Sequence, residues 1–343
     1  MASKGTIFLA TMSVASAHGS ARVSPTPEIE AKFQAFESLF KKAYSTPEIR
    51  SYRMEVFAES LRVAALRTGA ALHGVTKFSD LTEEEFSDKY LSGYQRRKPS
   101  HPTAALPVEE MGGAPVPIDW RTKGVVTPVK DQGHCGSCWA FSVVEQVESQ
   151  ALQQKLLPHG STLSVQQMVD CDDFSHGCAG GSPETAYDYL TIGGGITTAD
   201  KYGKYIGNAT EKCHFSKASA VITAPAYPAY KSISRGKSGE AAMYAKIAST
   251  PMAICVQADL WKSYKGGIIS SADGCGGQDP DALNHCVQVV GVGEDAETKS
   301  PYWIVRNSWG ADFGNDGYVY LATGGNVCGI AMEASVAVGL AGV

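Results

Sequence analysis

Two cysteines, Cys135 and Cys138, stand three residues apart in the segment QGHCGSCWAFS. A C-x-x-C pair can be a redox dithiol, half of a metal site, or a nucleophile beside a structural cysteine. A redox dithiol is typical of a βαβ pattern, and no such pattern surrounds this pair. A zinc site would need four ligands, and the spacings of this pair and of Cys171 and Cys178 fit poorly. The nucleophile interpretation requires partner residues elsewhere in the chain.

A nucleophilic cysteine needs a histidine base and a residue that orients the imidazole. His285, in DALNHCVQVVGVG, heads a strand-like run 147 residues after Cys138. Asn307, in VRNSWG, ends another such run 169 residues after Cys138, and this longer separation suggests an added surface loop near residues 294–301. These three residue types together favour nucleophilic catalysis.

The N-terminus indicates a compartment in which disulfides persist. Lys4 precedes a mainly apolar stretch over residues 7–15, and Ala15-Ser16-Ala17 gives a small-x-small cleavage site. Residues 1–17 are therefore predicted to be a secretory signal peptide. No later run reaches the ~18 apolar residues that span a bilayer. We expect a soluble mature protein of the secretory pathway, in a lysosome or vacuole or outside the cell.

Composition is that of an ordinary globular protein. The 343 residues suggest one large or two modest domains, with 43% hydrophobic and 19% charged residues. The net charge of -5 supplies no basic surface for phosphate, so nucleic acid is not an expected partner. Nine cysteines occur, all after residue 134, and the odd count leaves at least one thiol outside any intramolecular disulfide set.

Residues 27–92 are charge-rich, cysteine-free and helical in pattern. Apolar residues recur every three or four positions over 28–44 and again over 49–66. Asp80 and a glutamate three residues later have the spacing of a capping box. Residues 96–118 hold five prolines, two glycines and a basic triplet, which predicts an extended, exposed linker. The arrangement is typical of a pro-segment before a catalytic domain, or simply of two domains.

The remainder of the chain divides into a helical half and a sheet half. Residues 138–155 carry the apolar stripe of a long buried helix. Short runs rich in Val, Ile and Tyr predict strands at 251–258, 285–293, 301–309 and 317–322. Ligand clefts often form where two such halves meet.

Several motifs occur in an order that resembles one known family. DQGHCGSCWAFS, CAGG, NHCVQVVGVG and YWIVRNSWG resemble the papain-like cysteine proteases, closest to the cathepsin L-like branch with an inhibitory pro-segment. In that family the histidine follows the cysteine by ~130–150 residues, as His285 does here. The pro-segment match is looser. Gly74, Phe78 and Asp80 fit the signature G-x-N-x-F-x-D, with Thr76 in place of asparagine.

The resemblance implies an α+β fold of two subdomains, a helical left half and a β-barrel-like right half with the active-site cleft between them. It divides the chain into a signal peptide over 1–17, an inhibitory pro-segment and linker over 18–113, and a peptidase domain over 114–343. It implies no cofactor and no metal. Protein and peptide substrates, the chain's own pro-segment and cystatin-like inhibitors are the partners expected of a monomer.

By the same resemblance, Cys138 is the nucleophile at the start of the long helix. Helix-end N–H groups and an adjacent imidazolium favour its thiolate. His285 shares that ion pair and protonates the leaving amine. Asn307 holds the imidazole, and Trp309 shields this contact from water. Gln132 and the backbone N–H of Cys138 form the oxyanion hole.

The resemblance also pairs six cysteines, as Cys135–Cys178, Cys171–Cys213 and Cys275–Cys328. Two further cysteines, Cys255 and Cys286, align with positions that line the S2 pocket. We expect both to be buried free thiols that act as small hydrophobes. The alternative is a fourth disulfide, which requires their Cα atoms to lie within about 7 Å.

Substrate contacts are implied at two places. Gly180 and Gly181, followed by Ser182 and Pro183, resemble the strip that pairs with an extended substrate, and Ser182 stands where a larger apolar residue is frequent. Glu333 aligns with the base of S2, where an ionised carboxylate would pair with arginine at P2 and turn aside for Leu or Phe. We expect hydrophobic residues and arginine at P2, with arginine favoured more as the pH rises.

The competing interpretation from another class is a non-catalytic papain-like protein that binds other proteins. Such a protein would be expected to lose Cys138, His285 or Gln132, and all are present. No paired-histidine loop of the carboxydipeptidase kind occurs, which favours an endopeptidase. The sequon N-A-T predicts N-glycosylation at Asn208.

Overall fold

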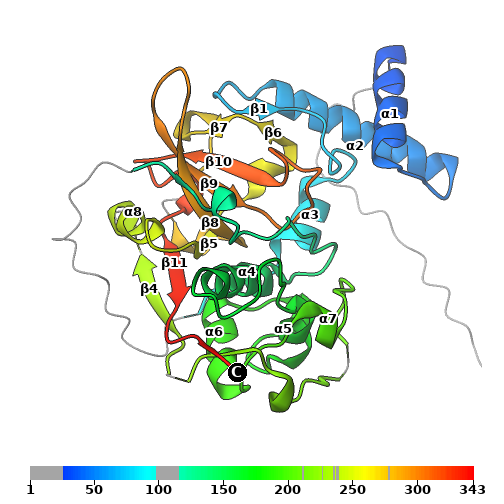
Figure 1. Cartoon of the computed structure of the whole chain (residues 1–343). Helices are drawn as coiled ribbons and strands as arrows, with labels where there is room; N and C mark the ends of the chain where they lie inside the picture. Colours follow the sequence, from blue (N-terminus) through cyan, green and yellow to red (C-terminus); the bar gives the residue numbers. More distant parts are fainter. Residues whose placement is uncertain are drawn as a thin grey trace, which may run out of the picture.

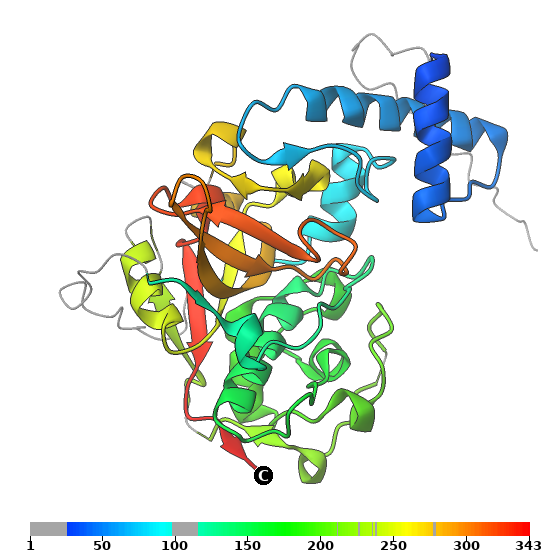
Figure 2. The same ribbon diagram turned by 45° about the horizontal axis from the view of Figure 1, so that its top comes forward.

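The computed structural model describes residues 26–97 and 116–343, apart from residues 211, 226, 235, 237, 238, 277 and 278. The signal peptide predicted over 1–17 and most of the predicted linker lie outside the described residues. Figures 1 and 2 show two N-terminal helices at one end of the molecule, then a strand-rich body, then a helix-rich body.

The two N-terminal helices are α1 (Pro27–Phe40) and α2 (Pro47–Ala65), and they confirm the helices predicted from apolar periodicity. Each has a proline in its first turn and a threonine N-cap whose hydroxyl accepts a backbone N–H. The helices meet through aromatic rings. The ring of Phe57 lies 5.3 Å from that of Phe33 and 5.0 Å from that of Phe36, measured between centroids. This small core holds the pair together outside the main body.

The chain then runs along the strand-rich body. β1 (Leu72–His73) pairs antiparallel with β6 (Tyr264–Gly266), and is followed by α3 (Glu83–Phe86) and a π-helical turn over Ser87–Leu91. β1 thus adds a strand of the N-terminal segment to an edge of the body, which anchors the segment through backbone hydrogen bonds.

The capping box of α3 lies two residues later than predicted. Thr82 is the N-cap, its N–H donates to Oε2 of Glu85 (2.9 Å), and the N–H of Glu85 donates to Oγ1 of Thr82 (3.1 Å). Asp80 faces away and accepts from Nζ of Lys42 and Oη of Tyr44, both at 2.9 Å. A cation and a hydroxyl from the loop after α1 satisfy this carboxylate, so it is not available to cap the helix.

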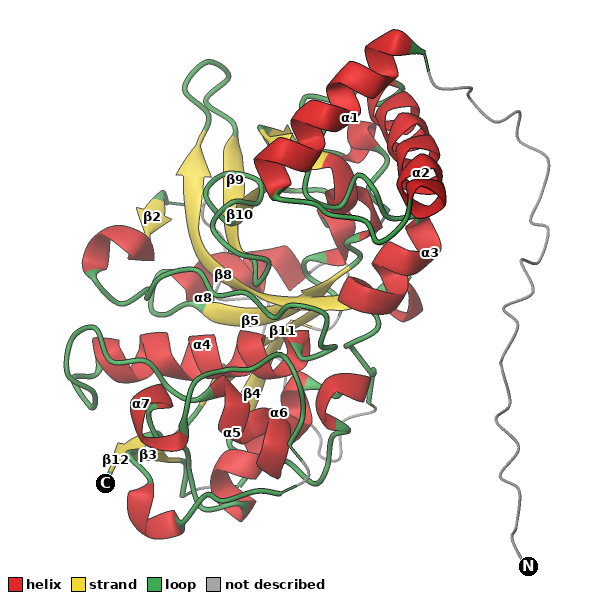
Figure 3. Ribbon diagram, turned by 90° about the vertical axis from the view of Figure 1, so that its right-hand side faces the viewer, coloured by secondary structure: helices red, strands yellow, loops and turns green. Residues whose placement is uncertain are grey.

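The helix-rich body surrounds the long helix α4. Residues Cys138 to Leu152 of α4 are all buried, and Figure 3 shows the helix between the sheet and the remaining helices. A helix that is buried all round must lie in the core. The elements of this body are α4 (Cys138–Gln153), α5 (Val165–Cys171), α6 (Pro183–Ile192), α7 (Ala199–Tyr202), and the pair β3 (Ile222–Thr223) and β12 (Ala341–Gly342).

The strand-rich body is built on an eight-stranded sheet in the order β4-β11-β5-β8-β9-β10-β7, with β2 paired to β8. Four of these strands, β5, β8, β9 and β10, confirm the strands predicted from the apolar runs. The bounds are β2 (Ile118–Asp119), β4 (Tyr230–Ser234), β5 (Met252–Val256), β7 (Ile268–Ile269), β8 (His285–Glu294), β9 (Pro301–Arg306), β10 (Tyr318–Ala322) and β11 (Glu333–Ala337), with helix α8 (Glu240–Ile247) beside them.

Short 3-10 turns connect these elements, at Trp120–Lys123, Gly177–Ala179, Lys217–Ser219, Asp259–Ser263, Ser271–Asp273, Pro280–Ala282 and Val327–Gly329. The predicted surface loop near 294–301 is the exposed turn that joins β8 to β9. No described helix is both long and apolar enough to cross a bilayer.

The two bodies meet where α4 packs against β8 and β5. This contact decides the position of the candidate catalytic residues. Cys138 begins α4, His285 begins β8, and Asn307 follows the last residue of β9. The helical half therefore supplies the candidate nucleophile, and the sheet half supplies the candidate base and its orienting residue.

Candidate active site

The candidate nucleophile, Cys138, is the first residue of α4, and its side chain is fully buried. All the cysteines of the chain lie among the described residues, and Cys138 alone has no disulfide partner. The N–H groups of a first helical turn lack partners within the helix, and the positive end of the helix dipole favours an anion there. A sulfur at this position is suited to carrying negative charge.

The candidate base, His285, is fixed by two neighbours. Its Nε2 donates to Oδ1 of Asn307 at 2.7 Å, and the same oxygen accepts the backbone N–H of Ser308 at 2.8 Å. The indole of Trp309 stacks on the imidazole, with ring centroids 4.7 Å apart and planes at 25°. Within the described residues Nδ1 of His285 has no hydrogen-bond partner. The ring is thus held at one nitrogen and on one face, and its other nitrogen is left for a proton transfer.

Gln132 is held between the two halves. Its Nε2 donates to the carbonyl of Cys135 (3.1 Å), its Oε1 accepts from Oγ of Ser308 (2.6 Å), and its backbone N–H donates to the carbonyl of Ser308 (2.8 Å). The side chain is fully buried. Two hydrogen bonds hold the side-chain amide and a third holds the backbone, next to the loop that leads to Cys138, and such fixed geometry is what an oxyanion donor needs.

Burial opposes charge on both members of the candidate pair. Burial raises the pKa of the Cys138 thiol to about 12. It also lowers the pKa of His285 to about 4, and the hydrogen bond to Asn307 raises that same pKa by a smaller amount. At neutral pH a thiol and a neutral imidazole are therefore stable in this form of the protein. The thiolate–imidazolium pair predicted from the sequence is disfavoured while the site is covered.

The cover is the segment that follows the π-helical turn. The carbonyl of Gly93 accepts the N–H of Gly181 (3.0 Å), and the N–H of Gln95 donates to the carbonyl of Gly181 (2.8 Å). This is a parallel bridge between Tyr94 and Gly181. A Cβ added to Gly93 would lie 2.9 Å from Sγ of Cys138, so glycine lets the backbone approach the sulfur closely. The predicted substrate strip at Gly180 and Gly181 is thus occupied by the N-terminal segment.

Beyond the strip, the same segment reaches Glu333. The hydroxyl of Tyr94 donates to Oε2 of Glu333, and Nε of Arg96 donates to Oε1 of Glu333 at 3.1 Å. Arg96 also donates from Nη1 to Oδ1 of Asp281 (2.7 Å). No pattern in the sequence marks Tyr94 or Arg96 as partners of Glu333, since more than 200 positions separate them along the chain.

Aromatic side chains of the N-terminal segment cover the indole of Trp309. Phe78 and Phe86 meet it edge-on, each with centroids 5.4 Å away, and Tyr90 lies at 6.0 Å. Such contacts between buried rings stabilise beyond their area alone. Nζ of Lys77 donates to the carbonyl of Trp309 (2.6 Å), which ties the segment to the loop after Asn307.

The structure contains the three disulfides implied by the resemblance and one more. The expectation of two free thiols at Cys255 and Cys286 is wrong, because these residues form the fourth disulfide. The cause is strand register. β5 and β8 are antiparallel neighbours, Cys255 lies directly opposite Cys286, and their Cα atoms are 4.0 Å apart. Both residues belong to the buried cluster that contains Cys138 and Tyr94.

The other predicted contact residues lie at the start of α6. Ser182 is the N-cap of α6, where its hydroxyl accepts the N–H of Thr185 (3.3 Å), and it is buried. Pro183 lines a small cavity together with Cys255 and Glu333. Asn208 is exposed at the surface of the helix-rich body, and its glycosylation stays a prediction.

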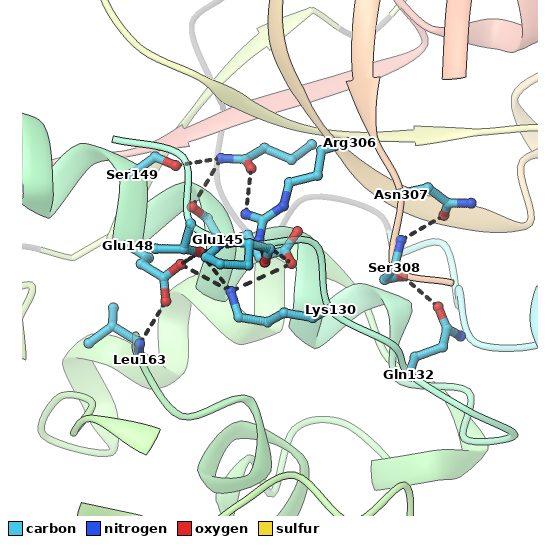
Figure 4. A network of polar contacts seen from close by, with 12 residues as sticks. Lys130, Gln132, Glu145, Glu148, Ser149, Leu163, Arg306, Asn307 and Ser308 are labelled. Carbon is cyan, nitrogen blue, oxygen red and sulfur yellow. Dashed lines mark hydrogen bonds and ion pairs between the residues drawn. The ribbon is translucent and has the colours of Figure 1, made fainter. Parts of the chain in front are cut away.

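A buried ionic network lies behind the candidate site (Figure 4). Nη2 of Arg306 lies 3.2 Å from Oε1 of Glu145, and both side chains are almost fully buried. Nζ of Lys130 lies 3.0 Å from Oε1 of Glu148. Nε2 of Gln288 donates to Oγ of Ser149 (3.0 Å). Since Glu145 is on α4 and Arg306 directly precedes Asn307, these contacts join the nucleophile's helix to the strand that carries the orienting residue.

Comparison with known proteins gives two family matches. Residues 114–338 match the model of the papain family cysteine proteases, and residues 33–86 match the cathepsin propeptide inhibitor domain (I29). Cysteine proteinase 1 of Dictyostelium discoideum is 36% identical over 361 residues, covering 97% of this chain and 99% of that protein. Cathepsin F of Mus musculus is 37% identical over 314 residues, covering 89% of this chain, and the match spans 64% of the length of cathepsin F.

Among solved structures, that of the digestive procathepsin L2 proteinase from Tenebrio molitor larval midgut has a TM-score of 0.78 and 30% identity. It covers 90% of this chain and 99% of its own. The fold is therefore the papain-like α+β fold, with the N-terminal segment placed as in a proform. The chain belongs to the papain family of cysteine proteases and carries a cathepsin-type propeptide inhibitor domain ahead of its protease domain.

Proposed function

We propose that this chain is a cysteine endopeptidase made as a self-inhibited zymogen. One observation carries the proposal: a free cysteine at the start of α4 shares a buried site with a histidine held 2.7 Å from Asn307, and the chain's own Gly93 lies against the cysteine sulfur. In the proposed division, residues 1–17 are the signal peptide, 18–113 the inhibitory pro-segment and linker, and 114–343 the mature enzyme. The mature enzyme works in a lysosome-like compartment or outside the cell.

The proposed reaction begins once the pro-segment leaves. Nδ1 of His285 takes the proton of Cys138, and the thiolate adds to the carbonyl carbon of the scissile peptide. Nε2–H of Gln132 and the backbone N–H of Cys138 stabilise the negative oxygen of the tetrahedral intermediate. His285 then gives its proton to the leaving nitrogen, and a thioester on Cys138 remains. A water molecule, deprotonated by His285, hydrolyses the thioester and restores the thiol.

Self-inhibition follows from how the pro-segment lies. It pairs with Gly181, fills the cluster around Cys138, and removes water from the site, which raises the pKa of Cys138 and lowers that of His285. A site held in the uncharged state has little thiolate with which to attack a peptide.

The proposed S2 pocket accepts arginine as well as hydrophobic residues at P2. The hydrogen bond from Arg96 to Glu333 supports this, because a guanidinium from the chain itself already uses that carboxylate. Hydrophobic residues would fill the part of the pocket formed by Cys255, Cys286 and Met332. Arginine is expected to gain over phenylalanine as the pH rises, and Glu333→Ala should remove that gain.

The test is incubation of the purified full-length chain at acidic pH, followed by N-terminal sequencing and an assay with fluorogenic peptides. We expect a new N-terminus near residue 114 and peptide hydrolysis that appears with it. Cys138→Ala should show neither under the same conditions.

A non-catalytic binding protein is the alternative, and an epoxide that alkylates active thiolates separates the two. Stoichiometric labelling of the processed chain at Cys138 supports the enzyme. If the processed chain neither takes the label nor cleaves any peptide, the proposed function is wrong.

A further inference from the structure

Tyr94 occupies the S2 region of the structure as a ligand would. Its backbone lies opposite Gly181, with hydrogen bonds to that glycine on both sides. Its ring enters the buried cluster that also contains Cys138, Leu283, Met332 and the disulfide of Cys255 and Cys286. The residue is 9% exposed. The pocket thus already holds an aromatic residue that this chain supplies.

The far end of this pocket is polar. The hydroxyl of Tyr94 donates to Oε2 of Glu333, whose side chain is 7% exposed. Burial, and then the charge of Glu333, raise the pKa of Tyr94 well above its usual range, so the phenol keeps its proton and acts as the donor. Apolar walls around the ring and a buried acceptor beyond it match a phenol better than a phenyl group.

The direction of the chain does not alter this match. The segment around Tyr94 runs parallel to Gly181. In either direction, the residue that pairs opposite Gly181 in an extended chain projects its side chain from the same face of the strip. A substrate residue paired there would therefore enter the cluster that Tyr94 fills.

On the proposed function of the site as a protease cleft, we infer that Glu333 makes the S2 pocket prefer tyrosine to phenylalanine at P2. A pocket built around a buried acceptor disfavours the analogue that lacks the donor, because the acceptor then loses that hydrogen bond. Phenylalanine fills the same apolar walls and leaves the carboxylate without the phenol. The proposed function has the pocket accept hydrophobic residues and arginine. The inferred preference is finer, because it separates two aromatic residues that differ by one hydroxyl group.

The experiment compares kcat/KM of the acid-processed enzyme for peptides that differ only at P2, which is tyrosine, phenylalanine or O-methyltyrosine. We expect tyrosine to exceed phenylalanine by about tenfold, the worth of a hydrogen bond to a charged group. O-Methyltyrosine has the ring and the oxygen but no donor, and it should fall to the phenylalanine value or below it. Equal rates for tyrosine and O-methyltyrosine would overturn the inference without any mutation.

Two variants assign the effect to one carboxylate. Glu333→Leu should bring the ratio of tyrosine to phenylalanine to one or less, whereas Glu333→Gln keeps an acceptor and should retain part of the preference. Glu184→Gln tests the other carboxylate near the phenol, because Glu184 lines the same cavity as Glu333, whereas the hydroxyl of Tyr94 donates to Glu333. A ratio that responds to Glu184→Gln and not to Glu333→Leu would contradict the assignment. If the proposed protease function is wrong, none of the three peptides is cleaved. If only the inferred preference is wrong, the peptides are cleaved but tyrosine is not favoured over phenylalanine.

Discussion

Nε2 of His285 lies 2.7 Å from Oδ1 of Asn307, and that oxygen also accepts the backbone N–H of Ser308. Because the amide oxygen is already an acceptor, the imidazole nitrogen that faces it must carry the proton. The other nitrogen, Nδ1, is then the one that can accept a proton from Cys138. A hydrogen bond that selects the tautomer of a base is expected to matter to catalysis more than to substrate binding.

Asn307→Ala should therefore lower kcat of the processed enzyme on the order of 10²-fold, with a smaller change in KM. Without the amide of Asn307, nothing would fix the tautomer of His285, and the imidazole would keep only its stacking on Trp309. Steady-state kinetics with a fluorogenic peptide measure both constants. A rise in KM with unchanged kcat would show that Asn307 acts through substrate binding instead.

Acid should weaken the hold of the pro-segment on the site. The covered His285 has a pKa of about 4, below its ordinary value of 6.5, so the covered site favours the neutral imidazole. The neutral imidazole therefore gives its full contribution to the affinity of the pro-segment above about pH 6.5. This contribution is lost as the pH falls toward 4, and the affinity of the pro-segment for the site should fall by at most about tenfold per pH unit. In the Cys138→Ala zymogen, proteolytic susceptibility of the pro-segment should rise across this window. The matched variant Cys138→Ala with His285→Gln should respond less steeply, and equal slopes would contradict the prediction.

Alkylation of Cys138 should be slow in the zymogen and fast after processing. Burial raises the pKa of this thiol to about 12, and the thiolate is the reactive species. Iodoacetamide labelling at pH 7, followed by mass spectrometry, should give a rate for the processed enzyme at least about tenfold above that of the zymogen. Similar rates in the two forms would show that the pro-segment does not control the ionisation of the sulfur.

Four disulfides leave one thiol per chain. Denatured protein should therefore contain a single reactive thiol, and none after Cys138 has been alkylated in the processed enzyme. Thiol titration under denaturing, non-reducing conditions gives this number directly. Two thiols found after Cys138 has been alkylated would mean that Cys255 and Cys286 are not joined in the protein.

Loss of the buried partner of Arg306 should destabilise the chain strongly. Glu145→Gln leaves the guanidinium buried beside a neutral group, and unfolding of the Cys138→Ala chain in guanidinium chloride should show a loss of about 3–5 kcal/mol. The matched control is Glu294→Gln, which removes an exposed partner of Lys299 and should cost less than about 1 kcal/mol. Similar losses for the two variants would show that burial does not set the strength of the Arg306 pair.

Much of the site follows from the sequence because its residues lie at element boundaries. Cys138 begins a helix with a continuous apolar stripe, and His285 and Asn307 stand at the ends of strand-like runs. Local patterns define such boundaries well. Gln132 lies six residues before the helix, and it reaches the site through contacts with Ser308 that no local pattern contains. The role predicted for Gln132 therefore rests on the resemblance to the family.

What the sequence did not predict depends on register and on long-range contact. The free-thiol expectation was wrong because nothing local shows that Cys255 faces Cys286 across two strands. The capping box was misplaced because Asp80 is satisfied by Lys42 and Tyr44 from a distant loop. The contact of Tyr94 with Glu333 joins residues 239 positions apart along the chain, and spacing along the sequence carries no signal for such pairs.

The fourth disulfide adjoins the candidate base, because Cys286 directly follows His285 in β8. A thiol nucleophile is kept active in the laboratory by adding a reducing agent, and a thiol reagent can also split a sulfur–sulfur bond. A reductant in the assay buffer therefore acts on the disulfide beside His285 as well as on the nucleophile. Rates recorded with a strong and with a weak reductant should be compared before any preference at P2 is assigned to the native pocket.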